Sequence, residues 1–497
     1  MLSSCRENSF SDCTFVIILL EQKRLVLKKI FIIISSLFLF ISFLPALDLV
    51  STQDLLLSYL ENDVELQKLT LNAQKAELSE QSVKIDNGFD VSLSSGTVTI
   101  KASQDGTKIT AKPKAEAELP QASNLSLSAE TSFTSTSKDA DLSDTTFSAS
   151  VDIISDKNAT RKVSLLKAQR TKLEAKRDVN ARAIAAEKEF YSELKGLLSS
   201  INTIIKNQST LYSDTIAFEQ VKAKGYSSSS STYRLSQMKV LSDQHTVDSG
   251  IKELIHDYVV FYKKCGYDLD LSGGNDIMNL LPKDIENVEE IDVTFLDKEL
   301  FTKIESAKWT NYINSLERDS KKSFSLSVNG GYTIDNSITS SDTVNAGLTG
   351  SYQGLSLGAQ VLFPVGSEEN NPSFSLTASI SLNTFRKAGI TAKQNELLEE
   401  QELLDIQSAE NSYKTYIVSA RQSLEQLKWE QSTTKESLDM YVSLEKDLAT
   451  WYKNGIISES EYLSAKTSLN QYKVETEINK IDLLIYNDEV KANFVCN

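Results

Sequence analysis

The side chains that most often carry out chemistry are few in this sequence. The chain has 497 residues but only two histidines, His245 and His256. Its four cysteines, at positions 5, 13, 265 and 496, match no zinc or CxxC redox spacing. No nucleophile–base pair, metal-ligand cluster or phosphate-binding loop stands out. The sequence therefore predicts a protein that is not an enzyme and that uses no cofactor.

The clearest local motif is Ser458-x-x-Glu461, which has the spacing of a helix capping box. It follows Gly455 in the segment WYKNGIISES, and the first half of the chain has a similar segment, KAKGYSSSS, around Gly225. Glycine commonly ends a helix because it adopts the left-handed conformation there. We therefore predict that Gly225 and Gly455 form the turns of two helical hairpins.

The overall charge limits the class of partner. The formal net charge is −16, and no basic cluster occurs in the body of the chain. Nucleic-acid binding needs a basic face that neutralises phosphates. The sequence therefore predicts no nucleic-acid partner.

The N-terminal region has the pattern of an export signal. Residues 23–46 read KRLVLKKIFIIISSLFLFISFLPA, which places basic residues before an apolar run and a small residue after it. The run is shorter than the roughly 20 residues of a membrane helix. We expect residues 1–46 to be a signal-peptide region, with 1–22 as an over-extended gene start. No cysteine follows the apolar run, so a lipoprotein anchor is not expected there.

The rest of the chain reads as two repeats of one design, residues 47–280 and 281–497. Each repeat runs through a shorter helix, alternating strands, a very long helix, a glycine turn and a further helix. The helices are expected at 51–84, 158–222, up to 264, 296–320, 384–454 and 458–490. A helix of about 65 residues is on the order of 100 Å long, so it must pack beside others as a coiled-coil-like wall.

Apolar residues alternate in several short segments, which predicts strands with one apolar face. The clearest sets are Leu125, Leu127, Ala129 and Phe133; Phe147, Ala149, Val151 and Ile153; Phe324, Leu326, Val328, Tyr332 and Ile334; and Phe374, Leu376, Ala378, Ile380 and Leu382. Segments 124–135 and 372–383 are long enough to cross a bilayer as strands. We expect four such strands per chain, too few to close a barrel, and hence a trimer with twelve. Residues 89–118 and 343–364 are possible additional strands that put this count in doubt.

The order of elements over residues 48–490 resembles the TolC-like family of outer-membrane efflux proteins. The stretches that carry the resemblance are STQDLLLSYLENDVELQ (51–67), KKCGYDL (263–269) and YKNGIISESEYLSAKTSLNQYKVETEINKIDLLIYN (452–487). The resemblance implies an α+β fold of mainly long α-helices: a trimeric α-barrel that forms a periplasmic tunnel, joined to a transmembrane β-barrel and built from two repeats. It also implies an outer-membrane channel for efflux or type I secretion. Such a channel is a passive conduit joined to an inner-membrane pump through a periplasmic adaptor.

The same resemblance implies a pore gate at the periplasmic end, where the helices meet at Gly225 and Gly455. Glu461 takes the place of a pore-facing acid, and Tyr452 takes that of a gating tyrosine. For Glu461 the alternative is the capping box alone, and for Tyr452 it is a place in an ordinary apolar helix stripe.

Two positions depart from the family pattern. The second acid of the family is Ser464 here, and its gating arginine is Ile457. A gate held through that arginine is therefore not expected. The competing hypothesis for the whole chain is an exported trimeric coiled-coil adhesin or structural stalk. The strands disfavour it, because they occur twice and are flanked by helices each time.

Overall fold

The computed structural model describes residues 50–103, 106–136, 140–270, 277–282, 284–321, 324–335, 341–366 and 371–495. The expected signal-peptide region, 1–46, lies outside the described residues. The chain from Ser51 onward forms one unit, to which the following description applies. Within the described residues, no helix is both long enough and apolar enough to cross a membrane.

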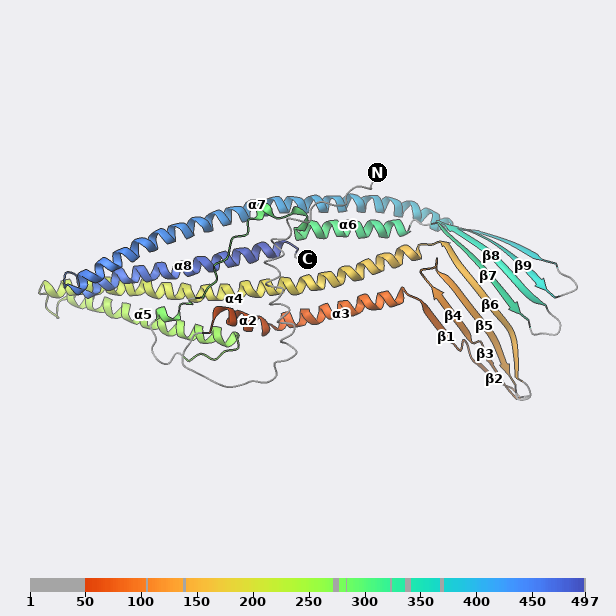
Figure 1. Cartoon of the computed structure of the whole chain (residues 1–497), viewed down its shortest axis with the longest axis horizontal. Helices are drawn as coiled ribbons and strands as arrows, with labels where there is room; N and C mark the ends of the chain where they lie inside the picture. The colour runs from red at the N-terminus through yellow and green to blue at the C-terminus, as the bar shows by residue number, and fades with distance from the viewer. Residues whose placement is uncertain are drawn as a thin grey trace. The chain divides into compact units, whose positions relative to one another are not determined.

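The first half of the chain places a run of strands between helices (Figure 1). Its elements are α2 (Thr52–Glu61), α3 (Val64–Asp86), β1 (Asp90–Ser94), β2 (Thr99–Ser103), β3 (Gly106–Ala111), β4 (Lys114–Leu119), β5 (Leu125–Ser135), β6 (Ala140–Ile154), α4 (Lys157–Ala223) and α5 (Ser231–Lys264). Ser51 caps α2, because its Oγ accepts a hydrogen bond from the Asp54 N–H at 3.1 Å.

The expected single helix over 51–84 is wrong, since the chain makes two helices there. Asp63 begins the second one: its Oδ1 accepts the Leu66 N–H at 2.7 Å, and its backbone is extended. A residue in this capping conformation cannot continue the preceding helix. The Arg182 side chain from α4 donates to the other carboxylate oxygen of Asp63, at 3.0 Å from Nε, so packing on α4 also holds this break.

The second half repeats the order of helix, strands, long helix and final helix. Its elements are three short 3-10 turns, η1 (Ile277–Leu280), η2 (Val293–Phe295) and η3 (Lys298–Leu300), then α6 (Thr302–Lys321), β7 (Ser325–Ile334), β8 (Asp342–Tyr352), β9 (Leu355–Val365), β10 (Ser373–Ile380), α7 (Leu382–Lys453) and α8 (Glu459–Asn493). The predicted α+β class with mainly long helices is confirmed. The division into repeats at residue 280 stays a prediction.

The four helices that connect directly to strands pack in the order α3, α4, α6, α7. A partly buried ion pair joins each neighbouring pair. Lys172 lies 3.0 Å from Glu80 between α4 and α3, and the Arg170 Nη2 donates to Glu305 at 2.8 Å between α4 and α6. Between α6 and α7, Arg318 lies 2.8 Å from Glu402. The helix order matches the order of the attached strands, β1, β6, β7 and β10.

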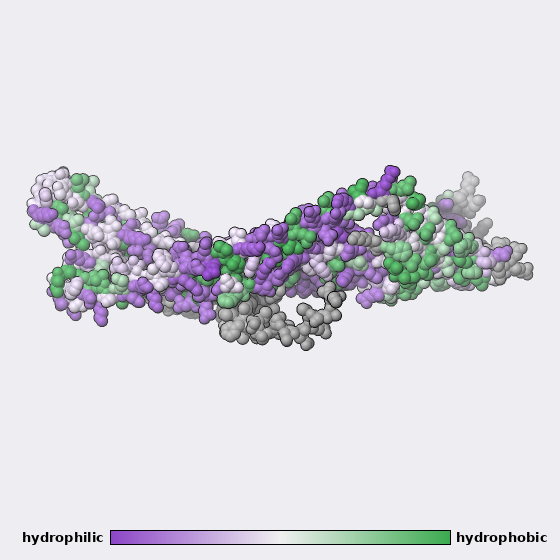
Figure 2. Space-filling view, turned by 90° about the horizontal axis from the view of Figure 1, so that it is seen from above, coloured by the Kyte–Doolittle hydropathy of each residue, from purple (hydrophilic) through white to green (hydrophobic). Residues whose placement is uncertain are grey.

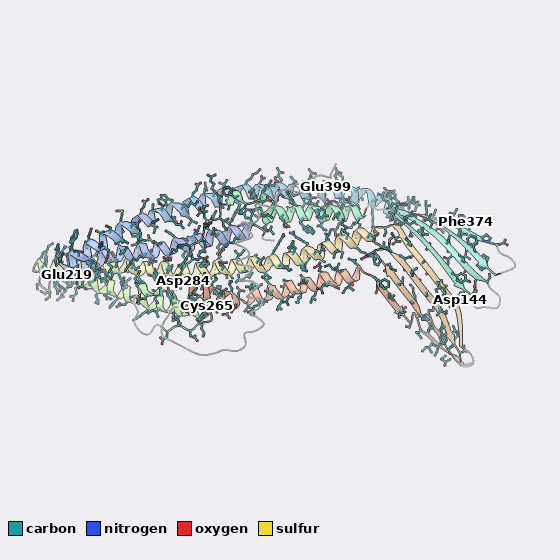
Figure 3. All side chains as sticks on the ribbon, viewed as in Figure 1. Asp144, Glu219, Cys265, Asp284, Phe374 and Glu399 are labelled. Carbon is teal, nitrogen blue, oxygen red and sulfur yellow. The ribbon has the colours of Figure 1, made fainter. Side chains whose placement is uncertain are left out.

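Two apolar clusters hold the helices together farther from the sheet. One is centred on α4 and α5, where Phe190 lies 5.3 Å from Phe261 between ring centroids. The other surrounds Phe301, which contacts Tyr416 and Phe494. Burying side chains of this size contributes roughly 1.5–3 kcal/mol each. Asp284 also fixes the segment that follows α5, because it accepts hydrogen bonds from the N–H and Oγ1 of Thr52, both at 2.6 Å (Figure 3 labels Asp284).

The strands form one antiparallel sheet of ten strands within the described residues. β1 and β2 lie end to end beside β4 and β3, and these in turn lie beside β5. The sheet then continues in chain order from β5 to β10. β1 and β2 together run once along the length of the sheet, and so do β3 and β4. The ten described strands therefore run along the sheet eight times.

The expected count of four long strands per chain is therefore too low. The possible additional strands are present: segment 89–118 forms β1–β4, segment 343–364 forms β8 and β9, and all of them belong to the one sheet. The prediction that these segments are additional strands is confirmed. They were not counted among the four because small residues, such as Ala115, Ala117 and Ala346, weaken their apolar alternation.

Candidate functional site

The sheet has one apolar face and one polar face across its whole width. Directly paired residues of neighbouring antiparallel strands point to the same face, so each row across the sheet can be followed. One such row contains Val91, Ala117, Leu127, Ala149, Gly330, Ala346, Val361 and Phe374. The next row contains Asp90, Glu118, Ser126, Ser150, Asn329, Gly347, Gln360 and Ser375. Figure 2 shows the hydrophobic side chains gathered over the strands, while the helices are mostly hydrophilic.

Hydroxyl groups of the polar face bond to one another between strands. The pairs are Ser128 with Ser148 (2.6 Å), Thr146 with Thr333 (3.1 Å), Ser325 with Ser351 (2.5 Å) and Ser356 with Ser379 (2.7 Å). The charged residues of this face are mostly acidic, among them Asp90, Glu116, Glu118 and Glu130. This face can therefore hold water and favour cations, which the opposite face cannot do.

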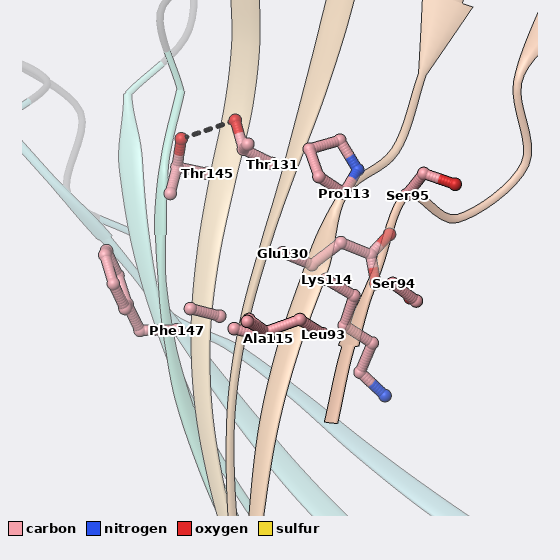
Figure 4. A pocket seen from close by; sticks show the side chains of 11 residues that line it. Leu93, Ser94, Ser95, Pro113, Lys114, Ala115, Glu130, Thr131, Thr145 and Phe147 are labelled. Atoms are coloured by element: carbon pink, nitrogen blue, oxygen red, sulfur yellow. Dashed lines mark hydrogen bonds between the residues drawn. The ribbon is translucent and has the colours of Figure 1, made fainter. Parts of the chain in front are cut away.

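The apolar face has a hollow of about 470 Å³ over β1, β4, β5 and β6 (Figure 4). It forms where small side chains, Ala115 and Ala129, lie between the larger Leu93 and Phe147. The hydroxyls of Thr131 and Thr145 at its border bond to each other at 2.9 Å. They thus satisfy each other's polar groups on a face that offers few other partners. Its only charged lining residues are Lys114 and Glu130, and the described residues hold no cluster of His, Cys, Asp or Glu that could bind a metal, so we assign the hollow no ligand.

The second predicted turn lies at the end of α7 that is remote from the sheet. Gly455 has φ of +71°, and its N–H donates to the Tyr452 carbonyl at 2.9 Å, while the Ile456 N–H donates to the Trp451 carbonyl at 2.9 Å. These two bonds are a Schellman motif, which ends the helix and requires a left-handed residue. A side chain on Gly455 would meet no atom within 4 Å, so only its backbone conformation favours glycine.

Tyr452 and Glu461 both take part in joining α7 to α8 at this turn. The Tyr452 ring stacks flat on Tyr462, with centroids 5.2 Å apart, and the Tyr462 hydroxyl donates to Glu445 at 2.9 Å. Glu461 completes the capping box: its carboxylate accepts the Ser458 N–H at 2.8 Å, and the Ser458 Oγ accepts the Glu461 N–H at 3.3 Å. The bond from the Ser458 N–H lowers the pKa of Glu461. Tyr462 was not among the residues singled out from the sequence, since only the folded hairpin brings it onto Tyr452.

The first predicted turn is held differently. Gly225 has φ of +75°, and its N–H donates to the Lys222 carbonyl at 2.9 Å. Glu219 marks this end of the molecule in Figure 3. Close to the turn, the ring of Phe218 meets Tyr233 edge-on at 5.1 Å, and the Lys222 ammonium lies 4.1 Å from the Phe218 ring centroid. The aromatic contact is therefore buried in this hairpin, whereas in the other it is a partly exposed stack.

An acidic pair lies farther down the first hairpin, and sequence reasoning missed it. Asp214 on α4 is 2.7 Å from Lys239 on α5, and this contact lowers the pKa of Asp214. The pKa of Asp243, one turn from Lys239, is raised by burial and by the adjacent Asp214. The three side chains form one cluster between α4 and α5. No short motif links residues this far apart in the sequence, so no sequence signal pointed to the pair.

Two family models match nearly the whole chain. Residues 55–285 match the TP096X N-terminal domain, and residues 286–497 match the TP096X C-terminal domain. A search of curated proteins found no match.

Several solved structures show a distant likeness. One is CusC, whose crystal structures show conformational changes that accompany folding and transmembrane channel formation. It is 14% identical, with a TM-score of 0.48, and the match covers 91% of this chain and 95% of CusC. VceC, an outer-membrane protein of Vibrio cholerae, is 11% identical, with a TM-score of 0.44 over 89% of this chain and 96% of its own. The MtrE outer-membrane channel of Neisseria gonorrhoeae is 11% identical, with a TM-score of 0.42 over 89% and 88%. These proteins are of the class to which the sequence was likened, the TolC-like outer-membrane channels.

Proposed function

We propose that this chain, which carries the two TP096X domains one after the other, is the protomer of an outer-membrane channel that extends into the periplasm. Its role is efflux or type I secretion. The channel is a passive conduit and not an enzyme, and it joins an inner-membrane pump through a periplasmic adaptor. The protomers assemble as a homotrimer in which the sheets form a transmembrane β-barrel and the long helices form a tunnel.

The observation that carries this proposal is the two-sided sheet. Strands β5, β8 and β9 contain 11 residues each and β7 contains 10 residues. A strand of this length crosses a bilayer when it is tilted. A strand in a membrane barrel alternates between an apolar side for lipid and a polar side for the lumen. Here the alternation continues from β1 to β10, with local register shifts between β5 and β6 and between β6 and β7. A sheet that packed on a protein core would instead cover its apolar face with helices, and the described helices pack on one another.

The helices supply the remaining features of a conduit. α4 and α7 contain 67 and 72 residues, so each is on the order of 100 Å long. Both begin directly after a strand and end at a hairpin turn remote from the sheet. A ring of such helices would enclose a tunnel that starts at the membrane and narrows where the turns meet. We propose Glu461 and Tyr452 as gate residues of that end, with Gly225 and Gly455 as its turns.

Single-channel conductance in a planar bilayer tests the proposal, with the detergent-purified protein measured beside its oligomer mass. We expect discrete, cation-preferring steps from a trimer. Replacing Glu116 and Glu118 on the polar face by Gln should lower the cation preference without abolishing the steps, because these carboxylates would line the lumen. Glu399→Gln, on an exposed part of α7, is the matched control (Figure 3). A soluble monomer with no conductance would contradict the proposal.

Two neighbouring residues of β8 test which face meets lipid. Leu348 belongs to the apolar face and Thr349 to the polar face, and both are exposed. A lysine on the lipid side of a barrel costs about 2–4 kcal/mol at the bilayer centre. We expect Leu348→Lys to reduce the yield of membrane-inserted protein strongly and Thr349→Lys to leave it near wild type. Equal yields for the two variants would contradict the assignment of the faces.

A further inference from the structure

A strap of chain, residues 284–300 between α5 and α6, crosses the long helices (Figure 1). Asn487 of α8 bonds to its backbone twice: the Asn487 Nδ2 donates to the Glu289 carbonyl at 2.9 Å, and the Asn487 Oδ1 accepts the Ile291 N–H at 3.0 Å. The Tyr486 hydroxyl, also from α8, donates to the Ile291 carbonyl at 3.3 Å. Because these bonds fix the backbone of the strap, the side chains that it holds in solvent have a defined position.

Phe295 of the strap is the most exposed large apolar side chain among the described residues, at 86%. It ends the turn η2, whose backbone Asp292 fixes: the Asp292 Oδ1 accepts the Thr294 N–H at 2.9 Å. Val293, two residues earlier, is fully buried in the cluster around Phe301. The Phe295 ring is therefore presented to solvent from a fixed turn. Single exposed apolar residues are common on protein surfaces, so the meaning of this one depends on its surroundings.

The surroundings of Phe295 are acidic. The strap has seven carboxylates and a single lysine, whose ammonium pairs with Glu410 of α7. The carboxylates belong to Asp284, Glu286, Glu289, Glu290, Asp292, Asp297 and Glu299. Lysines of α6 and α7 pair with two of them. Asp292 and Asp297, which flank Phe295, have no ion pair within 4 Å among the described residues, and the hydrogen bond from the Thr294 N–H lowers the pKa of Asp292. Both carboxylates therefore lack a basic partner in the described part of the chain.

An exposed ring flanked by two carboxylates suits arginine better than any other side chain. The planar guanidinium stacks on an aromatic ring and binds a carboxylate through two N–H groups, whereas the lysine ammonium offers only a point charge. A lipid surface would accept the ring, but the carboxylates of the strap would repel its phosphates. An apolar pocket alone would accept the ring and leave the carboxylates without compensation. Charge complementarity therefore favours a protein segment that is rich in arginine.

We propose that the strap is a docking surface for an arginine-rich segment of a different protein, whose guanidinium groups stack on Phe295 and bind Asp292 and Asp297. The strap contains none of the proposed gate residues or hairpin turns, and it lies outside the strands of the sheet. The docking is therefore additional to the proposed conduit. Because the contact is charged and exposed, its affinity should fall as the salt concentration is raised.

Binding of a fluorescein-labelled arginine-rich peptide to the detergent-purified protein, followed by fluorescence anisotropy, tests the docking. Phe295→Ser should weaken binding roughly two- to fivefold, the effect of a cation–π contact at an exposed site. Asp292→Asn combined with Asp297→Asn should weaken it by about tenfold, because two charged contacts are lost. Asparagine can still cap the turns that these residues begin, so the strap stays folded. Tyr312→Ser and Glu399→Gln are the matched controls, since they remove an exposed ring and an exposed carboxylate outside the strap.

The outcomes separate this inference from the proposed function. The docking is supported if the strap variants bind more weakly, the controls bind as wild type does, and a lysine-rich peptide of equal length binds less tightly. That result stands even if the protein conducts no ions. Equal binding by all variants, equal binding of the two peptides, or an equal loss in Glu399→Gln would show attraction to the net charge alone and overturn the inference. A smaller oligomer mass for Phe295→Ser would also overturn it, because the ring would then be covered by another copy of this chain.

Discussion

The two helical hairpins have the same outline but are held by different chemistry. In the α4–α5 hairpin a buried phenylalanine meets Tyr233 edge-on, and a charged cluster of Asp214, Lys239 and Asp243 lies below it. In the α7–α8 hairpin a partly exposed Tyr452 stacks on Tyr462, and a Schellman motif and a capping box border the turn. The first hairpin is therefore fixed by burial and charge along its length. At its turn the second is fixed by an exposed stack and by backbone geometry, and farther along Tyr441 stacks on Tyr472 at 5.0 Å and the Asn479 Nδ2 donates to the Thr434 Oγ1 at 3.0 Å.

This difference indicates which hairpin can move more easily. Opening the second turn would separate a partly exposed aromatic stack and the hydrogen bond from the Tyr462 hydroxyl to Glu445, and water can hydrate the freed groups. Opening the first would expose a buried ring and separate charges. If the tip of the tunnel opens and closes, we expect the α7–α8 hairpins to move first. Three comparisons between matched variants test this difference.

The largest effect is expected from removing the aromatic ring near each turn. Phe218→Ala deletes a ring that is 8% exposed, which should destabilise the first hairpin by about 3 kcal/mol. Tyr452→Ala deletes a ring that is 39% exposed and should cost about 1 kcal/mol. Hydrogen exchange of peptides from each hairpin measures both values as faster amide exchange. Equal effects, or a larger effect for Tyr452→Ala, would contradict the view that the first hairpin is held more firmly than the second.

A smaller effect is expected from placing alanine at the turn glycines. Both positions have room for a methyl group, so the cost is the left-handed backbone, roughly 1–2 kcal/mol. We expect the full cost for Gly455→Ala, because two hydrogen bonds of its Schellman motif fix the conformation. Gly225→Ala should cost less, since the longer serine-rich connection can relax. Gly455→Asn is the control for backbone strain: asparagine tolerates this conformation, so it should be milder than alanine.

The smallest effect is expected from pH. A carboxyl whose pKa is raised in the folded state, as for Asp243, stabilises at low pH, and that contribution is lost as pH rises through the folded pKa. The lowered pKa values of Asp214 and Glu461 act in the opposite sense, and their contribution is lost as pH falls through them. Rising pH should therefore loosen only the first hairpin, whereas strong acid should loosen both.

Asp243→Asn provides the control for this pH dependence. It should remove the loosening of the first hairpin as pH rises through the pKa of Asp243 and leave the second unchanged. The measurement is again hydrogen exchange of the two hairpins, corrected for the intrinsic effect of pH on amide exchange. A loosening of the first hairpin with rising pH that persists in Asp243→Asn would assign that response to another group.

Local features of this fold could be read from the sequence because they depend on residues close together in the chain. Ser51, the long helices after residues 156 and 381, and the alternation around Leu127 and Phe374 all follow from short-range periodicity or capping. The break at Asp63 was missed because the helical period continues through it. There the capping bond from Leu66 and the bond from Arg182, which is far away in the sequence, end one helix and begin the next.

The residue pattern alone predicted long paired helices, strands with one apolar and one polar face, few groups able to do chemistry and two glycine turns. The number and order of the strands, the stacking of Tyr452 on Tyr462 and the contact of Asp214 with Asp243 became known from the folded chain. The same holds for the exposure of apolar residues such as Leu78 of α3 and Leu404 of α7. The periodicity of a helix or strand determines which residues share a face, and this depends on residues close together in the chain. Which surface covers that face depends on contacts between residues far apart in the chain.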